Sequence, residues 1–389
     1  MNVQTMSPVV AAMEKILTES AVVHGNNSGQ SPETPGISEL SKRGYQFLKE
    51  RKINEAIYCF DRILTLDEKN NYALVGIGDA IRKQNKFEEA AEYYRRCLDH
   101  HPGNNYALFG LADCYKALNQ YHKAIEVWEQ YLSHDDRNVT VLTRIADTYR
   151  KIHDFKNSKM VYLRVLQMDE KNPYAIIGLG HLHYDFKEYQ NALHYWEKMI
   201  EINRGNVDIR VLTSIGNCHR KLKTFSQGIP YFEMALQRDK YNFYALFGLA
   251  DCYRGISRQQ ISLEYWNKIL ETDPRNKVIL TRAGDAYRGM GNLDKASEYY
   301  HRALNVEFDP YAVLGLAETV KIQGRYNEAI ESLRRLIQQD PRNHRFYLGL
   351  ADCYIRKNDK AKAIDALAEF QKQGIRNSAV SAELEKLKS

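Results

Sequence analysis

Small and large apolar residues recur along the chain with a period of about 34 residues. Near copies of one segment begin at Asn70, Asn104, Asn172 and Asn242, and in each copy a Gly or Ala follows a large apolar residue. This small residue recurs at Gly44, Gly78, Ala112, Ala146, Gly180, Gly216, Ala250, Gly284, Ala317 and Ala351. A fixed period of this length is typical of repeat proteins, so the sequence predicts ten repeats over about residues 37–375.

Each repeat carries two helical patterns. We number every repeat so that the small residue is position 8. In the third repeat, positions 4, 7, 8 and 11 are Leu108, Leu111, Ala112 and Tyr115. Positions 17, 20, 24 and 27 are Tyr121, Ala124, Trp128 and Tyr131. Both sets have the spacing of one face of an α-helix, so each repeat is predicted to be a helix pair.

Turn residues separate the two helices and the successive repeats. Position 15 is Asn or Gly at Asn85, Asn119, Gly291, Gly324 and Asn358, residues that tolerate the left-handed backbone that ends a helix. Position 34 is Asn at Asn70, Asn104, Asn138, Asn172, Asn206, Asn242, Asn276 and Asn343. An Asn there is able to cap the next helix. One helix pair cannot bury its own apolar face, so the pairs must stack into an all-α solenoid of antiparallel helices.

This pattern resembles the tetratricopeptide repeat family, and the resemblance covers nearly nine-tenths of the chain. The third repeat meets it with Leu108, Leu111, Ala112, Tyr115, Ala124 and Trp128. The resemblance implies a right-handed superhelix whose first helices line a concave groove. It also implies a protein-binding function, without naming the ligand.

The ends of the chain depart from the repeats. Residues 1–36 are expected to be a flexible segment in which residues 9–23 either fray or form a short docking helix. Residues 37–375 would form the ten-repeat solenoid, and residues 376–389 a capping helix with Val380, Leu384 and Leu387 on one side. Two extra residues before the sixth repeat, around Val207 and Asp208, and Pro230 within it predict a late start or a bend in its second helix.

In the family geometry, positions 2, 5, 9, 12 and 13 face the groove. Position 9 is acidic in seven repeats and position 12 is basic in seven. These positions lie three residues apart on one helix, so each acid is able to meet a base. We expect a ladder of structural ion pairs within and between repeats, which neutralises itself.

A two-repeat alternation overlies this ladder. The third, fifth and seventh repeats carry aromatic or apolar groups at positions 2 and 5, whereas the fourth, sixth and eighth carry Leu-Thr-Arg or Leu-Thr-Ser. Two interpretations remain open, complementary packing of neighbouring repeats or alternate pockets for an extended peptide. The fifth repeat breaks the ladder with His181, Tyr184 and Asp185.

We therefore predict a set of partner-binding residues along the groove. Its central contact zone is Tyr174, His181, Tyr184, Arg210, Asn217 and Arg220. The remaining members are Tyr106, Phe109, Lys116, Arg144, Arg150, Tyr244, Phe247, Arg254 and Arg282.

Composition and motifs narrow the function. The chain has 55 Lys and Arg against 49 Asp and Glu, and its basic groups are matched by acids at fixed spacing, so we expect no nucleic-acid partner. No stretch approaches the ~20 apolar residues that span a bilayer. The six cysteines are scattered and no secretory signal is evident, so we expect a cytoplasmic protein with reduced cysteines.

Phosphate-binding, metalloprotease, hydrolase and EF-hand motifs are absent from the sequence, so we expect no catalytic residue, cofactor or metal. The favoured function is an adaptor that holds a partner protein's segment in the groove. The alternative is a regulatory or substrate-recruiting subunit of an enzyme on another chain, and an RNA-binding helical repeat is the third possibility.

Overall fold

The computed structural model describes residues 36–203 and 206–388, and within these ranges the chain is all-α, with 21 helices in tandem pairs and no strand. The predicted fold class, an all-α solenoid of helix pairs, is confirmed. The chain divides into an N-terminal unit, residues 1–186, and a C-terminal unit, residues 187–389. The helix expected over residues 9–23 lies outside the described residues.

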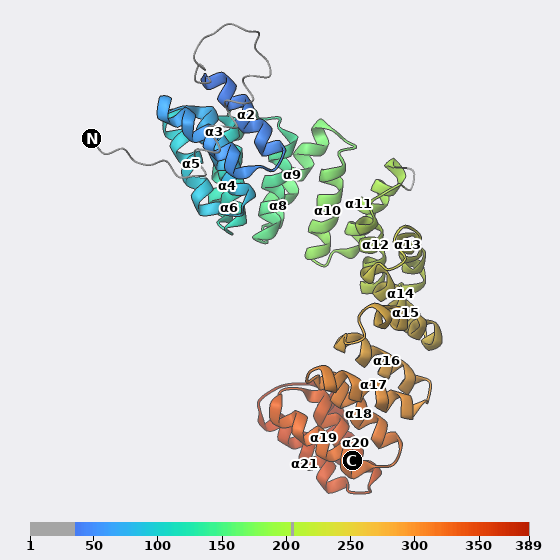
Figure 1. Ribbon diagram of the computed structural model, residues 1–389. Helices are drawn as coiled ribbons and strands as arrows, with labels where there is room; N and C mark the ends of the chain where they lie inside the picture. The colour runs from blue at the N-terminus through green and yellow to red at the C-terminus, as the bar shows by residue number, and fades with distance from the viewer. Residues whose placement is uncertain (1–35, 204–205, 389) are drawn as a thin grey trace, which may run out of the picture. The chain divides into compact units, whose positions relative to one another are not determined.

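The N-terminal unit contains helices α2 to α10, and each helix packs against the next in sequence (Figure 1). Their bounds are Ile37–Lys49 (α2), Ile53–Leu66 (α3), Asn71–Lys83 (α4), Phe87–His100 (α5), Asn105–Ala117 (α6), Tyr121–Leu132 (α7), Val139–Lys151 (α8), Phe155–Met168 (α9) and Pro173–Asp185 (α10).

The C-terminal unit contains helices α11 to α22, which pack in the same sequential way. Their bounds are Tyr189–Ile202 (α11), Ile209–Lys221 (α12), Phe225–Arg238 (α13), Phe243–Gly255 (α14), Gln259–Thr272 (α15), Lys277–Gly289 (α16), Leu293–Val306 (α17), Pro310–Ile322 (α18), Tyr326–Gln339 (α19), His344–Arg356 (α20), Lys360–Lys372 (α21) and Ser378–Lys388 (α22).

The helix bounds follow the repeat numbering closely. Every first helix runs from position 1 to position 13, and every second helix begins at position 17. The Asn caps form as expected in most repeats; for example, the Ala107 N–H donates to Asn104 Oδ1 at 3.0 Å. The expectation for Asn206 is wrong, because the two extra residues shift the cap of α12 to Asp208, which accepts from the Arg210 N–H at 2.8 Å.

Position 15 is left-handed in all ten repeats. Five of these residues are the predicted Asn and Gly, and five are side chains for which this backbone is unfavourable, namely Arg51, His153, Lys187, Lys223 and Ser257. The turn geometry is therefore set by the packing of the helix pair rather than by the local preference of the turn residue.

The core is organised around the ring at position 24. A Cβ added at Gly78 would lie 2.8 Å from Tyr94 Cε1, and one added at Gly110 would lie 2.3 Å from Tyr94 Cζ. The Tyr94 ring thus fills the space between position 8 of its own first helix and position 6 of the next one. The same fit to a position 6 glycine recurs for Phe60, Tyr162, Phe232 and Tyr300.

A tryptophan at position 24 changes the contact between successive first helices, which we call the joint. Trp128 and Trp266 are fully buried, and the first helix of the following repeat carries Arg144 or Arg282 at position 6 instead of glycine. Correspondingly, α4 packs closely on α6 and α12 on α14, whereas α6 and α8, and α14 and α16, do not pack closely. The two-repeat alternation therefore has a packing cause, which supports the first of its two interpretations.

The sixth repeat keeps its second helix. The expected late start is wrong, because α13 begins at Phe225 as the repeat numbering requires and continues through Pro230. Only its first turn differs. The Gln227 N–H bonds to the Thr224 carbonyl three residues back at 3.0 Å, whereas in the third repeat the Ala124 N–H bonds to the Gln120 carbonyl four residues back. This tighter turn precedes the position at which proline removes a donor.

Helix α22 closes the C-terminal unit. Its residues Val380, Leu384 and Leu387 are all buried and belong to the core cluster that includes Leu367 and Phe370 of α21. Its lysines Lys386 and Lys388 face outward, so the last apolar face of the array is covered by a helix with a charged rim.

Replacing a non-glycine residue that has a left-handed backbone with glycine should stabilise the array. We expect Lys223→Gly (φ 61°) to raise the free energy of unfolding by roughly 0.5–1 kcal/mol, because glycine adopts this conformation without a Cβ clash. Thermal unfolding followed by circular dichroism measures the change. The matched control Lys221→Gly, at the last residue of α12, should lower stability instead, and a stabilising control would contradict the explanation.

Filling the space beside a core ring should destabilise it. We expect Gly110→Ala to lower the free energy of unfolding by about 1–3 kcal/mol, because the new methyl group would force the Tyr94 ring to move. The control Gly103→Ala meets its nearest atom, His134 Cε1, at an ordinary 3.6 Å and should change stability by less than ~0.5 kcal/mol. Equal effects of the two changes in urea unfolding would refute this account.

Candidate functional site

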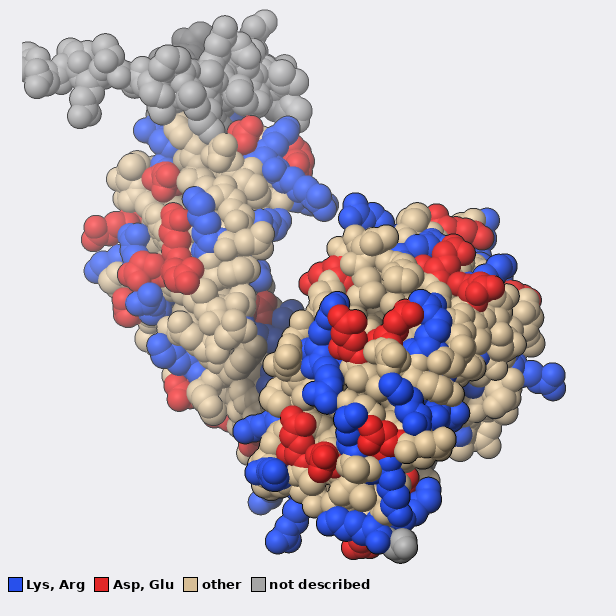
Figure 2. All heavy atoms as spheres, turned by 90° about the horizontal axis from the view of Figure 1, so that it is seen from below, with Lys and Arg blue, Asp and Glu red and all other residues tan. Residues whose placement is uncertain are grey.

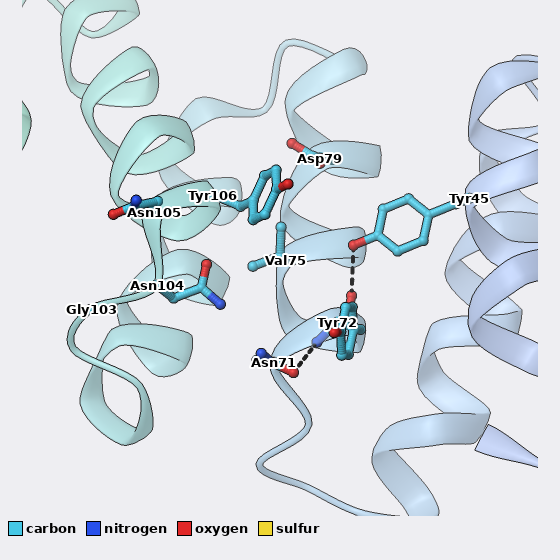
Figure 3. Close-up of a pocket in the computed structure, with 9 residues that line it drawn as sticks. All are labelled: Tyr45, Asn71, Tyr72, Val75, Asp79, Gly103, Asn104, Asn105 and Tyr106. Carbon is cyan, nitrogen blue, oxygen red and sulfur yellow. Dashed lines mark hydrogen bonds between the residues drawn. The ribbon is translucent and has the colours of Figure 1, made fainter. Parts of the chain in front are cut away.

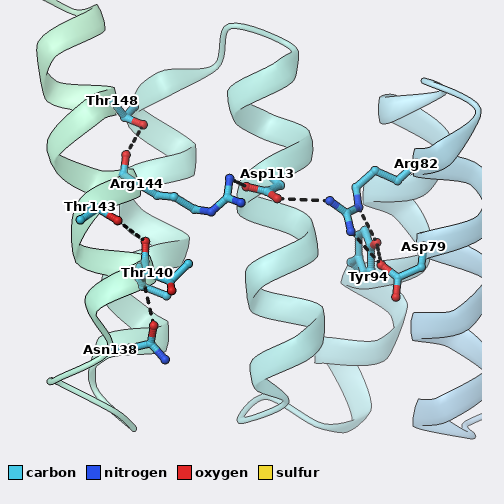
Figure 4. Close-up of polar contacts among 10 residues, drawn as sticks. Asp79, Arg82, Tyr94, Asp113, Asn138, Thr140, Thr143, Arg144 and Thr148 are labelled. Carbon is cyan, nitrogen blue, oxygen red and sulfur yellow. Dashed lines mark hydrogen bonds and ion pairs between the residues drawn. The ribbon is translucent and has the colours of Figure 1, made fainter. Parts of the chain in front are cut away.

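The acidic and basic groups of the first helices form a connected ladder in the N-terminal unit (Figure 4). Arg82 lies 3.1 Å from Asp79 in its own helix and 3.2 Å from Asp113 in the next first helix. Arg144 reaches back to the same Asp113 at 2.8 Å. The predicted ion pairs within and between repeats are therefore confirmed for these residues, and they neutralise one another.

The hydroxyl groups of core tyrosines donate hydrogen bonds to carboxylates of the ladder. Tyr94 donates its hydroxyl to Asp79 at 2.7 Å, and Tyr162 and Tyr300 donate to Asp147 and Asp285 at 2.6 and 2.8 Å. The sequence analysis missed these bonds. Their signal is the joint occurrence of Tyr at position 24 and Asp at position 9 in the second, fourth and eighth repeats.

The ladder continues within the C-terminal unit. Asp251, with a side chain 8% exposed, accepts from Arg220 at 2.8 Å and from Arg254 at 2.7 Å. Burial acts to raise the pKa of this carboxyl, but the hydrogen bonds from Arg220 and Arg254 outweigh it and hold the pKa below its usual value. At the equivalent Asp113, burial outweighs Arg144 and Arg82, and the pKa lies above its usual value.

Two adjoining cavities lie along the first helices of the N-terminal unit. One, of about 590 Å³, lies between α2, α4 and α6, and Tyr45, Val75 and Tyr106 point into it (Figure 3). The other, of about 440 Å³, lies beside it. Its lining is Asp79, Arg82, Asn105, Tyr106, Phe109, Gly110 and Tyr131. Asp79, Asn105 and Tyr106 line both, so the cavities form one strip, which we call the aromatic groove.

One tyrosine of this groove is fixed by a hydrogen bond, and two others are exposed to solvent. Tyr45 donates its hydroxyl to the Tyr72 carbonyl at 3.1 Å. The side chains of Tyr72 and Tyr106 are 60% and 79% exposed, although both begin helices whose inner faces are fully buried. Phe109 packs edge-on against Tyr131, with ring centroids 6.5 Å apart.

Exposed tyrosines recur at position 2 throughout the described chain. Tyr106, Tyr174 and Tyr244 were predicted as contact residues, and they are 79%, 73% and 68% exposed. The sequence analysis missed Tyr72 and Tyr311, which are 60% and 65% exposed, because it compared only the third to eighth repeats. Reading position 2 across all ten repeats would have found both.

The remaining predicted residues divide between the two units. In the N-terminal unit, Arg144 lies over the Phe109 ring at 4.8 Å, Lys116 lies over Trp128 at 5.7 Å, and Arg150 pairs with Asp185 at 2.5 Å.

In the C-terminal unit, Arg220 lies over Phe247 at 5.4 Å, and Arg210, whose side chain is 84% exposed, pairs with Asp208. The proposed central zone draws on α10 of one unit and α12 of the other, so it stays a prediction.

The cysteines offer no reactive thiolate in this fold. All six are free and buried, and burial raises the pKa of Cys59 and Cys97 to about 11 and that of Cys114 to about 12. Within residues 36–203 and 206–388, no three His, Cys, Asp or Glu side chains gather as a metal site would require.

The charged surface is mixed. On the face shown in Figure 2, Lys and Arg side chains alternate with Asp and Glu side chains and with uncharged residues. None of the helices described above is long and apolar enough to cross a membrane.

Lowering the pH should remove the contribution of the Asp251 carboxylate to folding stability. Its folded pKa is lowered, so its stabilisation is present above the unfolded pKa of about 3.9 and is lost as the pH falls through the folded value. We expect Asp251→Asn to cost about 3 kcal/mol at pH 7, because it leaves two guanidinium groups short of a buried carboxylate. Urea unfolding of both proteins should show a smaller difference at pH 3, and a difference independent of pH would contradict this.

Solved structures with similar folds are repeat proteins. A tetratricopeptide repeat protein from Parabacteroides merdae is 16% identical over 73% of this chain and 98% of its own, with a TM-score of 0.42. YrrB, described as a TPR protein with an unusual peptide-binding site, is 18% identical over 49% of this chain and 97% of its own, with a TM-score of 0.43.

Yeast Tom70 is 14% identical over 90% of this chain and 95% of its own, with a TM-score of 0.41. At these identities and scores the likeness carries no argument about function. Among curated proteins, no sequence matches the chain significantly.

Family models of the tetratricopeptide repeat match the sequence directly. They cover residues 42–104, 82–145, 139–172, 279–310 and 322–382, which together exceed half of the chain. The helix pairs, the repeat length and the small residues at the helix crossings agree with these matches. The chain therefore belongs to the tetratricopeptide repeat family.

Proposed function

We propose that the chain is a non-enzymatic protein-interaction scaffold whose aromatic groove holds an extended segment of a partner protein. The observation that carries this proposal is the strip of exposed tyrosines over two adjoining cavities in the N-terminal unit. Tyrosine supplies a large contact area at a low cost in conformational entropy, which suits it to binding surfaces.

The polar groups of the groove suit a peptide main chain. Asn71 and Asn105 line the cavities with amide groups that both donate and accept hydrogen bonds. The Asn105 side-chain oxygen is buried and has no hydrogen-bond partner among the described residues. A buried acceptor without a donor is costly, and an N–H group of a bound segment would satisfy it.

The charges of the groove indicate what kind of segment it takes. Asp79, Arg82, Asp113 and Arg144 are paired with one another, so they attract ligands of neither sign strongly. Binding would therefore depend on apolar and aromatic contact and would change little with salt. The segment that fits best is uncharged and carries apolar side chains that enter the two cavities.

This proposal is tested by removing the tyrosines without disturbing the fold. We expect Tyr72→Ala with Tyr106→Ala to weaken binding of a captured partner by about tenfold or more, because central aromatic residues dominate interface energies. Partners are first captured with the full chain and identified by mass spectrometry, and affinities are then measured by calorimetry. The melting temperature should stay unchanged, because both side chains are exposed.

The control removes equally exposed apolar groups outside the groove. Leu66→Ala with Met160→Ala changes side chains on α3 and α9 that are 66% and 59% exposed. A partner whose affinity falls equally in both double variants, or in neither, would refute binding in the aromatic groove.

A further inference from the structure

A comparison of equivalent joints in the two units reveals one arginine that differs from its counterpart. Arg144 and Arg282 occupy position 6 of the fourth and eighth repeats, each after a repeat with Trp at position 24. Arg144 pairs with Asp113 at 2.8 Å. Among the described residues, Arg282 has neither an ion pair nor a hydrogen bond, although it is half-buried at the equivalent place.

The residue at position 12, which is Lys116 in the third repeat and Arg254 in the seventh, explains the difference. Asp113 gives one carboxylate oxygen to Arg82 and the other to Arg144, while Lys116 lies over Trp128.

At the equivalent Asp251, one oxygen accepts from Arg220 at 2.8 Å. The other oxygen accepts from Arg254 at 2.7 and 3.0 Å. Arg254 replaces the lysine and takes the oxygen that Arg282 would otherwise use.

The local charge balance follows from the same comparison. At positions 6, 9 and 12 of α12, α14 and α16, four arginines stand against two carboxylates. These residues are Arg220, Arg254, Arg282, Arg288, Asp251 and Asp285. The same positions of α4, α6 and α8 hold four basic residues and three carboxylates, because Asp79 stands where Asn217 does. Asp185 adds a fourth carboxylate on Arg150.

The joint at Arg282 also has room and an apolar border. Helices α14 and α16 do not pack closely, and Tyr244 and Val278 at their first turns are 68% and 50% exposed. In the N-terminal unit the chain's own Asp113 supplies the carboxylate at the equivalent arginine. At Arg282 a carboxylate from outside the chain would complete the same pair.

We propose that the first helices α12, α14 and α16 bind an acidic segment of a partner protein, with a Glu or Asp side chain of that segment paired to Arg282. This goes beyond the function proposed above, since it concerns a different unit and a charged ligand. The Tyr72→Ala, Tyr106→Ala variant should leave this binding unchanged, so the two proposals fail separately.

The test uses the full chain and a labelled hexaglutamate peptide, with hexaglutamine and oligouridylate as comparison ligands, followed by fluorescence anisotropy. We expect binding of hexaglutamate that weakens with salt. Arg282→Gln should weaken it about fivefold. Arg335→Gln removes the same charge from an arginine that is 73% exposed on α19 and should change it less than about twofold.

A second variant keeps the net charge. Arg254→Lys recreates the arrangement around Lys116, so Asp251 becomes available to Arg282 and hexaglutamate binding should weaken by a similar factor. The proposal is overturned if hexaglutamate binds the wild type and Arg282→Gln equally, if Arg254→Lys binds as tightly as the wild type, or if oligouridylate binds more tightly than hexaglutamate.

Discussion

The fit of one aromatic ring against two helices is the constraint on which the repeat array depends. In the second repeat the ring is Tyr94, and it lies so close to Gly78 and Gly110 that a methyl group on either would force the ring to move. The ring size therefore sets how closely successive first helices approach. Where Trp128 or Trp266 replaces the smaller ring, the following helix carries arginine instead of glycine, and the joint is wider. The alternation on the groove surface is thus a consequence of the core beneath it.

The polar ladder depends on the same rings. Tyr94, Tyr162 and Tyr300 present their hydroxyls to Asp79, Asp147 and Asp285, so each smaller ring both spaces two helices and orients a carboxylate. The tryptophan repeats lack this hydroxyl, and there the carboxylates Asp113 and Asp251 are held by arginines of neighbouring helices. Small differences at position 12, such as Lys116 against Arg254, then decide which guanidinium groups remain available to a ligand.

The sequence predicted the repeat length, the helix pairs and the acid–base ladder, because each depends on regular spacing along the chain. It did not predict Asp208 as the cap of α12 or the uninterrupted start of α13 at Phe225, since both depend on how an insertion is absorbed by neighbouring packing. It predicted Arg144 and Arg282 alike, as equivalent positions. Only the distances around Asp113 and Asp251 separate the paired arginine from the one without a carboxylate.

From the third to the eighth repeat, tryptophan alternates with a smaller ring at position 24. Excising one of these repeats would bring a tryptophan against a position 6 glycine, or a smaller ring against a position 6 arginine or serine, in the buried interior. Excising two consecutive repeats would restore matching neighbours on either side of the cut. Over the third to eighth repeats the smallest interchangeable module is therefore a pair of repeats.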